Sequence, residues 1–181
     1  TMNSDVQLFN VFPNWVAVNM LDLKKLNIVA KKFTKRFESN LKTSLIEGDT
    51  LLDINSMNYL NIELTKLLSH LLKNKYKIFG FDLVDLWINK YEDNYQSAHV
   101  HAGDFSFIIY YQIDKSHTVL DSPVKNLLEI GKVDKVFDME YHLTLKQGSI
   151  IMFPSYLPHW VKPCSSGITI AGNIKMRELN E

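Results

Sequence analysis

The hydrophobic positions of the chain change their spacing near residue 78. Before that point, apolar residues recur at three- and four-residue steps in two segments, which predicts two amphipathic helices. The first covers residues 23–37 with Asp22 as its N-cap, and the second covers residues 57–71, opened by Asn55 or Ser56. We expect the basic residues of the first helix to form a solvated face and the leucines of the second to pack in the core.

After residue 78 the chain consists of short segments rich in β-branched and aromatic residues, separated by Gly, Pro, Asp or Ser. This pattern predicts strands. The predicted strands are 78–89, 96–101, 105–113, 126–130, 141–145, 149–153, 159–161 and 168–175, with one or two more in 8–18. Residues 115–125 and 131–140 are predicted to be long surface loops. Helices followed by strands indicate a mostly β, α+β chain, or a β-sandwich or barrel buttressed by helices.

The length of 181 residues suits a single domain over residues 1–181. We expect a helical buttress at roughly 20–75 and a β core at roughly 78–176. The single Cys164 excludes an internal disulfide and a cysteine zinc cluster.

The charge of the chain is balanced, with 20 Lys and Arg against 20 Asp and Glu. This balance argues against a general nucleic-acid binder. No segment approaches the roughly 20 apolar residues of a membrane-spanning helix, and the sequence has no signal-peptide pattern. We therefore expect a cytoplasmic protein with no nucleic-acid or membrane partner.

Three of the six histidines are candidates for a metal site. His99 and His101 stand two residues apart in a predicted strand, so their side chains project from the same face. His159 follows a proline-rich turn, and Asp104 is an alternative ligand. Three protein ligands with open positions are typical of a catalytic site for Fe, Zn, Cu or Ni. The His99–His101 pair also fits a buried hydrogen-bonded pair or a substrate-binding pair. We expect His117 at the surface.

Other common chemistries lack their sequence signatures. The chain has no nucleophile-elbow, phosphate-loop or dinucleotide-binding glycine motif.

Several segments resemble the 2-oxoglutarate/Fe(II)-dependent oxygenase superfamily. The nearest resemblance is to a group of small oxygenases assigned from sequence, and the prolyl hydroxylases are more distant. The segments follow the order of the family over about residues 78–176. They are Leu-Trp-Ile-Asn at 86–89, His-Val-His at 99–101, Phe-Ile-Ile-Tyr-Tyr at 107–111, Gly-Ser-Ile-Ile-Met-Phe-Pro at 148–154, Pro-His-Trp-Val at 158–161 and Ile-Thr-Ile-Ala-Gly-Asn at 168–173.

The resemblance implies a double-stranded β-helix, a jelly-roll or cupin-like barrel, with Fe(II) and 2-oxoglutarate as cofactors. In that family a His-x-Asp/Glu pair and a distal histidine hold the iron. His99 matches the first ligand and His159 the distal one. His101 stands where most of the superfamily has the acid, so this chain departs from the family pattern there.

The resemblance also suggests residues for 2-oxoglutarate. Tyr111 matches a strand tyrosine that donates its hydroxyl to the 2-oxoglutarate carboxylate, and its odd number continues the alternation of His99 and His101. The family usually has an Arg or Lys one strand after the distal histidine, where this chain has Gly167. The nearby cations are Lys162, Lys175 and Arg177.

The activity implied by the resemblance is hydroxylation of an unknown small-molecule or peptide substrate by a dioxygenase. Four residues match positions near the barrel mouth and are candidates for substrate binding: Trp87, Asn89, Trp160 and Asn173. The alternatives are a cupin-like metal-binding or non-enzymatic barrel, and an all-histidine iron dioxygenase that does not use 2-oxoglutarate. Exposed barrel edges often pair, which allows a homodimer.

Overall fold

The structure is a computed structural model that describes residues 15–30, 34–38, 41–47, 51–72, 80–91, 94–132, 138–164 and 167–177. Its helical elements are the 3₁₀ helix η1 (Leu23–Lys25) and the α-helices α1 (Ile54–Leu71) and α2 (Lys125–Ile130). The strands are β1 (Ala17–Met20), β2 (Thr34–Glu38), β3 (Leu41–Glu47), β4 (Phe81–Tyr91), β5 (Asn94–His99), β6 (Phe105–Tyr110), β7 (Thr118–Asp121), β8 (Glu140–His142), β9 (Ser149–Pro154), β10 (His159–Cys164) and β11 (Gly167–Met176).

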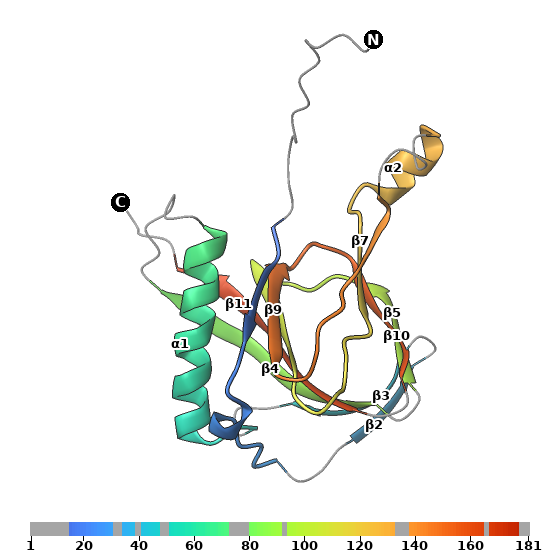
Figure 1. Cartoon of the computed structure of the whole chain (residues 1–181). Helices are drawn as coiled ribbons and strands as arrows, with labels where there is room; N and C mark the ends of the chain where they lie inside the picture. The colour runs from blue at the N-terminus through green and yellow to red at the C-terminus, as the bar shows by residue number, and fades with distance from the viewer. Residues whose placement is uncertain are drawn as a thin grey trace, which may run out of the picture.

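The strands form one continuous antiparallel path in the order β1-β9-β6-β11-β4-β3-β5-β10-β7-β8, with β2 paired to β3. Helix α1 lies beside the part of the sheet that holds β9, β11 and β4, whereas β5 and β10 lie on the far side (Figure 1). The described residues are therefore mostly antiparallel β-structure with few helices, consistent with a jelly-roll-like fold.

Alternation along the strands divides the hydrophobic core into two clusters. In β6, Phe107 and Ile109 belong to the cluster that includes the leucines of α1, whereas Ile108 and Tyr110 belong to a second cluster. The second cluster contains residues from both halves of the strand order, and it includes Leu120 of β7. The first cluster attaches the helix, and the second surrounds the cavity described below.

The second predicted helix is confirmed as α1. It begins at Ile54, slightly before the predicted start, because the carboxylate of Asp53 caps it by accepting a hydrogen bond from the backbone N–H of Ser56 at 2.8 Å. Its leucine stripe is buried, and the buried leucines are Leu60, Leu64, Leu67 and Leu68.

The first predicted helix is wrong. Asp22 does cap a turn, accepting from the backbone N–H of Lys24, but only the 3₁₀ turn η1 follows it. Within the predicted helix, Thr34–Glu38 form β2, which pairs with β3, and residues 31–33 lie outside the described part. Helical propensity is a weak preference, and strand pairing overrides it here. The expected helical buttress is thus one helix, a 3₁₀ turn and a β-hairpin.

Most of the predicted strands overlap strands of the structure. Between residues 115 and 130, however, one predicted strand and one predicted loop are wrong. The predicted strand 126–130 is wrong because Lys125–Ile130 form α2, which Gly131 ends by donating its N–H to the carbonyl of Leu127. The predicted loop 115–125 contains β7. Residues 8–14 of the predicted N-terminal strand region lie outside the described part, and β1 covers only its end.

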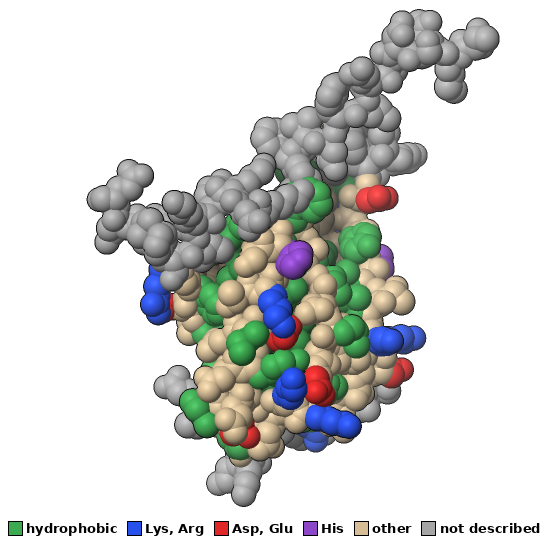
Figure 2. Space-filling model, turned by 60° about the vertical axis from the view of Figure 1, so that its left-hand side comes forward, with side chains coloured by type: hydrophobic (Ala, Val, Ile, Leu, Met, Phe, Trp, Pro, Cys, Tyr) green, Lys and Arg blue, Asp and Glu red, His purple; other side chains and the backbone are tan. Residues whose placement is uncertain are grey.

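The surface carries charges of both signs. In Figure 2, which brings forward the side that carries α1 in Figure 1, Lys and Arg side chains lie among Asp and Glu side chains without a large patch of one sign. None of the described helices has both the length and the apolar character needed to cross a membrane.

Candidate metal centre

Three histidines converge on one point in the interior. His99 ends β5, His159 begins β10, and these two residues are direct partners in the antiparallel pairing of the strands. His101 lies two residues beyond the end of β5. One ligand nitrogen from each of the three residues lies within 4.8 Å of the other two. The three predicted ligands are therefore brought together as a group able to hold a metal ion.

The orientation of two of the rings is fixed by the backbone. The Nδ1–H of His99 donates to the carbonyl oxygen of Ser97 at 2.7 Å, and the Nδ1–H of His159 donates to that of Leu157 at 3.1 Å. Because a carbonyl oxygen can only accept, each of these nitrogens carries the proton and the Nε2 lone pair is left for a metal.

His101 is positioned by a turn rather than by a strand. Its backbone N–H donates to the carbonyl oxygen of Ser155 at 3.0 Å. Gly103 follows with φ of 130°, a conformation that L side chains rarely adopt, and a Cβ there would lie 3.2 Å from the carbonyl oxygen of Ile174. The ring of His101 lies 5.1 Å from that of Trp87, measured between centroids.

Burial keeps two of the imidazoles neutral. It lowers the pKa of His159 to about 3 and that of His101 to about 4, with a further lowering from the neighbouring His99. The carboxylate of Asp85 acts in the opposite direction on His101. Neutral imidazole is the form that binds a metal, so these side chains are ready to ligate at neutral pH without losing a proton.

The histidines line a cavity of about 710 Å³. Trp87, Phe153 and Ala171 supply apolar walls, and Asp85 contributes a carboxylate. Among the described residues that line it there is no Lys or Arg. Three neutral nitrogen ligands beside such a cavity fit a divalent transition metal with coordination positions left for other molecules.

Five of the buried polar residues that line the cavity form a group that we call the inner polar layer. In β-sheet register, Thr169 of β11 lies between Asn89 of β4 and Tyr110 of β6. On the other side, Val161 of β10 is partnered by Gln96 of β5 and Thr118 of β7, one inward-facing position beyond His159. The hydroxyl of Tyr110 donates to Oγ1 of Thr118 at 2.8 Å and joins the two sides. The members of the layer are Asn89, Gln96, Tyr110, Thr118 and Thr169, each at most 9% exposed.

Tyr111 does not line the cavity, contrary to the prediction from alternation. Its side chain packs against the cluster beside α1, and its hydroxyl donates to the carbonyl oxygen of Leu26 at 3.3 Å. The turn at Gly103 resets the alternation after His101, so the neighbouring Tyr110 faces inward instead. Of the two adjacent tyrosines, Tyr110 lines the cavity and the predicted Tyr111 does not.

The predicted cations and the alternative ligand lie elsewhere. Lys162 lies with its Nζ 2.7 Å from Nδ1 of His142, and Lys175 is exposed. The carboxylate of Asp104 accepts from the backbone N–H of Met176 at 2.7 Å, and Asp104 is not part of the histidine group. Arg177 pairs with Asp82.

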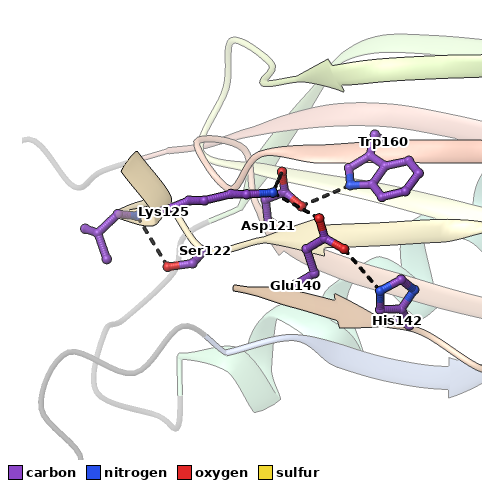
Figure 3. Close-up of polar contacts among 7 residues, drawn as sticks. Asp121, Ser122, Lys125, Glu140, His142 and Trp160 are labelled. Carbon is purple, nitrogen blue, oxygen red and sulfur yellow. Dashed lines mark hydrogen bonds and ion pairs between the residues drawn. The ribbon is translucent and has the colours of Figure 1, made fainter. Parts of the chain in front are cut away.

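Trp160 is directed away from the metal centre although it follows His159. Its indole N–H donates to the carboxylate of Asp121 at 3.0 Å (Figure 3). Lys125 and Glu140 form an ion pair at 2.9 Å beside it. Trp160 therefore belongs to a charged cluster outside the cavity, because strand alternation sends successive side chains to opposite faces.

The other substrate-binding candidates, Trp87, Asn89 and Asn173, do line the cavity. Asn173 donates to the carboxylate of Asp85 at 3.0 Å and accepts from the hydroxyl of Ser106 at 2.7 Å.

Sequence reasoning missed several polar residues that line the cavity. Among them are Asp85, Gln96, Tyr110, His117, Thr118 and Thr169. His117, expected at the surface, is half-buried. Thr118 was hidden by the assignment of its strand to a loop, whereas Asp85 could have been found from its position two residues before Trp87 on the same strand.

Comparison with known proteins gives matches among solved structures. No protein-family model and no curated protein matches the sequence. A prolyl-4-hydroxylase from Pseudomonas putida aligns with a TM-score of 0.53 and 15% identity, over 87% of this chain and 80% of that one. An oxidoreductase of the 2OG-Fe(II) oxygenase family from Burkholderia pseudomallei aligns with a TM-score of 0.51 and 13% identity, over 75% and 67%.

A third structure holds a metal and 2-oxoglutarate. It is HygX from Streptomyces hygroscopicus with nickel, 2-oxoglutarate and hygromycin B, which aligns with a TM-score of 0.50 and 12% identity over 85% of this chain and 74% of that one. At these identities the likeness concerns the fold. The chain is thus similar in fold to solved structures of 2OG-Fe(II) oxygenases.

Proposed function

We propose that the protein is a non-haem Fe(II)- and 2-oxoglutarate-dependent dioxygenase, and that its sheet path is that of a double-stranded β-helix. The observation that carries the proposal is the convergence of His99, His101 and His159 at the wall of the large cavity. The fold similarity described above supports the same activity. The iron and 2-oxoglutarate, when bound, would supply the oxidation of a substrate C–H bond by O₂.

The residues of the chain have separate tasks in this proposal. The three imidazoles hold the metal as neutral ligands and leave positions open for oxygen ligands. Trp87 and Phe153, which lie next to His101 and His159, shield the metal from bulk water. Asp85, held by Asn173, meets the substrate beside Trp87, and we propose a small molecule or a peptide as that substrate.

The three imidazoles are a suitable donor set for iron. The fit of the cavity to 2-oxoglutarate has one unusual feature. A cavity of about 710 Å³ is large enough for a small dicarboxylate. However, the described lining contains no Lys or Arg to pair with the carboxylate that does not bind the metal. The inner polar layer is the alternative partner for this carboxylate.

The test is an anaerobic titration of the metal-free protein with Fe(II), followed by 2-oxoglutarate, monitored by visible absorption. A weak band that needs both additions supports the proposal, because it reports chelation of Fe(II) by 2-oxoglutarate. The His159→Ala variant should give no band, whereas His142→Ala, altered at an exposed histidine outside the cavity, should behave like the parent. Failure of the parent to bind Fe(II) would contradict the proposed activity.

A second candidate is an iron dioxygenase that does not use 2-oxoglutarate. The observation in its favour is the same lack of Lys and Arg in the described cavity lining. Tight Fe(II) binding without the 2-oxoglutarate band would favour this candidate. Binding of Zn or Ni with no affinity for Fe(II) would instead favour a cupin-like metal-binding module.

A further inference from the structure

The charges inside the cavity are few and can be counted over the described lining. Three histidines face the metal position, and a fourth, His117, is neutral near pH 7 because burial lowers its pKa. Asp85 is the only carboxylate among these residues, and it is exposed and held by Asn173. A divalent metal bound to the histidines would therefore be the main positive charge of the cavity.

The inner polar layer consists of neutral hydrogen-bonding groups. The hydroxyl oxygen of Thr118 accepts from Tyr110 at 2.8 Å, and that of Thr169 accepts from the amide of Asn89 at 3.5 Å. Each threonine hydroxyl thus accepts a bond, and within the described residues neither donates one. Both protons are available to an anion entering the cavity.

Gln96 adds a third source of donors to the layer. It is 9% exposed, and no hydrogen bond of its side chain to another described residue is found. A buried polar group without a partner is costly, and a ligand oxygen would satisfy it. The layer therefore offers hydroxyl and amide donors that no described residue uses.

The site has two unusual features, a histidine instead of an acid at position 101 and a described lining without Lys or Arg. These two features compensate each other in charge. A divalent metal with three neutral imidazoles keeps its full double positive charge, and 2-oxoglutarate carries two negative charges. The charges of the metal and 2-oxoglutarate sum to zero without any side-chain cation, and Asp85 adds one negative charge at an exposed position of the lining. With a carboxylate at position 101, the same sum would be one negative charge buried in the cavity, which is unfavourable unless a cation is present.

We propose that His101 and the inner polar layer are a matched pair: the layer binds the far carboxylate of 2-oxoglutarate through hydroxyl and amide donors alone, and the metal is its only counter-charge. The inference rests on the proposed function and specifies how the cosubstrate is held. It makes Thr118 and Thr169 determinants of cosubstrate specificity, and it couples them to the identity of residue 101.

The first test removes the donors without changing the shape of the layer. In Thr169→Val and Thr118→Val a methyl group replaces the hydroxyl, and each should weaken 2-oxoglutarate binding to the Fe(II) protein roughly tenfold, as expected for a hydrogen bond to a charged group. Fe(II) affinity should not change. Thr118→Ser keeps the hydroxyl and should bind 2-oxoglutarate more tightly than Thr118→Val. Thr144→Val, altered at an exposed threonine outside the cavity, should bind like the parent.

The same variants are titrated with 2-oxopentanoate, which has the same carbon chain as 2-oxoglutarate but no far carboxylate. The parent should bind 2-oxoglutarate at least roughly tenfold more tightly than 2-oxopentanoate, and the two valine variants should lose most of that preference. An unchanged preference in both variants would overturn the inference.

The second test measures the coupling between residue 101 and the layer. His101→Asp should retain Fe(II) but weaken 2-oxoglutarate binding at least roughly tenfold, because it adds a negative charge beside a dianion. Thr169→Lys in the same chain should restore much of the loss, since Thr169 faces the cavity. Additive effects of the two substitutions, with Fe(II) bound in every variant, would contradict the pairing.

The two proposals fail in different ways. If the parent binds Fe(II) but not 2-oxoglutarate, both the cosubstrate in the proposed function and the present inference are wrong. Suppose instead that the parent binds both, that the valine variants bind like the parent, and that His101→Asp and Thr169→Lys have additive effects. Only the present inference is then wrong.

Discussion

His99 and His159 are direct partners across the antiparallel strands β5 and β10, and their ring centroids lie 4.4 Å apart. The sheet itself therefore fixes the relative position of two of the three candidate ligands. His101 lies beyond the end of β5 and reaches the other two from a turn, with centroid distances of 4.9 Å to His99 and 5.1 Å to His159.

Replacement of either histidine that lies in the sheet, His99 or His159, should abolish tight metal binding. We expect His99→Ala and His159→Ala each to lower the affinity for Fe(II) by at least about a hundredfold, since changes in residues that only support a ligand already cost roughly 10–100-fold. Circular dichroism should show that the fold is retained. If either variant binds Fe(II) like the parent in an anaerobic titration, the assigned ligand set is wrong.

The metal-free protein should lose stability as the pH falls below about 6.5. In the unfolded chain histidines titrate near 6.5, whereas burial keeps His101 neutral to about pH 4 and His159 to about pH 3 in the folded protein. Between these values the unfolded chain binds more protons, so the free energy of unfolding decreases with falling pH.

Urea unfolding at pH 7.5, 6 and 5 in the presence of a chelator measures this decrease. The His159→Gln variant has no titrating group at that position and should show a smaller decrease than the parent. Equal pH dependence in the two proteins would mean that His159 is not buried in the neutral form.

The carboxylate of Asp85 should strengthen metal binding without contacting the metal. Its negative charge acts on His101, and Asp85→Asn should weaken the affinity for a divalent metal roughly threefold to tenfold through the loss of that attraction. Asp82→Asn is the matched control, because Asp82 is on the same strand but pairs with Arg177 at the surface. A titration with Co(II) or Zn(II) distinguishes the two, and equal affinities would contradict the expected effect.

Helix α1 should depend on its buried leucines. Leu64 is fully buried in the cluster between the helix and the sheet, so Leu64→Ala should lower the free energy of unfolding by about 2–5 kcal/mol. Ile62 on the same helix is 56% exposed, and Ile62→Ala should change stability little. Chemical denaturation of the two variants makes the comparison, and similar losses in both would mean that α1 does not pack as described.

The group of three histidines could be predicted from sequence because the required information is local. His99 and His101 are close in the chain, and the segment around His159 resembles a family motif. Of the inner polar layer, only Asn89 was a candidate, through the family resemblance, and its other four residues could not be predicted in the same way. They come together only through the register of six strands, and threonine, asparagine and glutamine carry no distinctive sequence signal.

The errors in secondary structure also have physical causes. Phe37 continues a helical spacing of apolar positions that begins at Leu23, yet β3 offers residues 34–38 a partner strand, and a pattern within one segment does not reveal such a partner. The alternation that assigned Tyr111 to the cavity assumed an unbroken strand from His99. The turn at Gly103 breaks it, and a shift by one residue exchanges the two faces of a strand.

The separation of the ligands along the chain links metal binding to thermal stability. His99 and His101 remain near each other in an unfolded chain, but His159 joins them only when β5 and β10 are paired. A divalent metal held by these three residues would therefore bind the folded chain far better than the unfolded one, and each tenfold excess of free metal over its dissociation constant would add about 1.4 kcal/mol to the free energy of unfolding. Thermal melting with and without a metal thus becomes a way to rank candidate metals before any substrate is known.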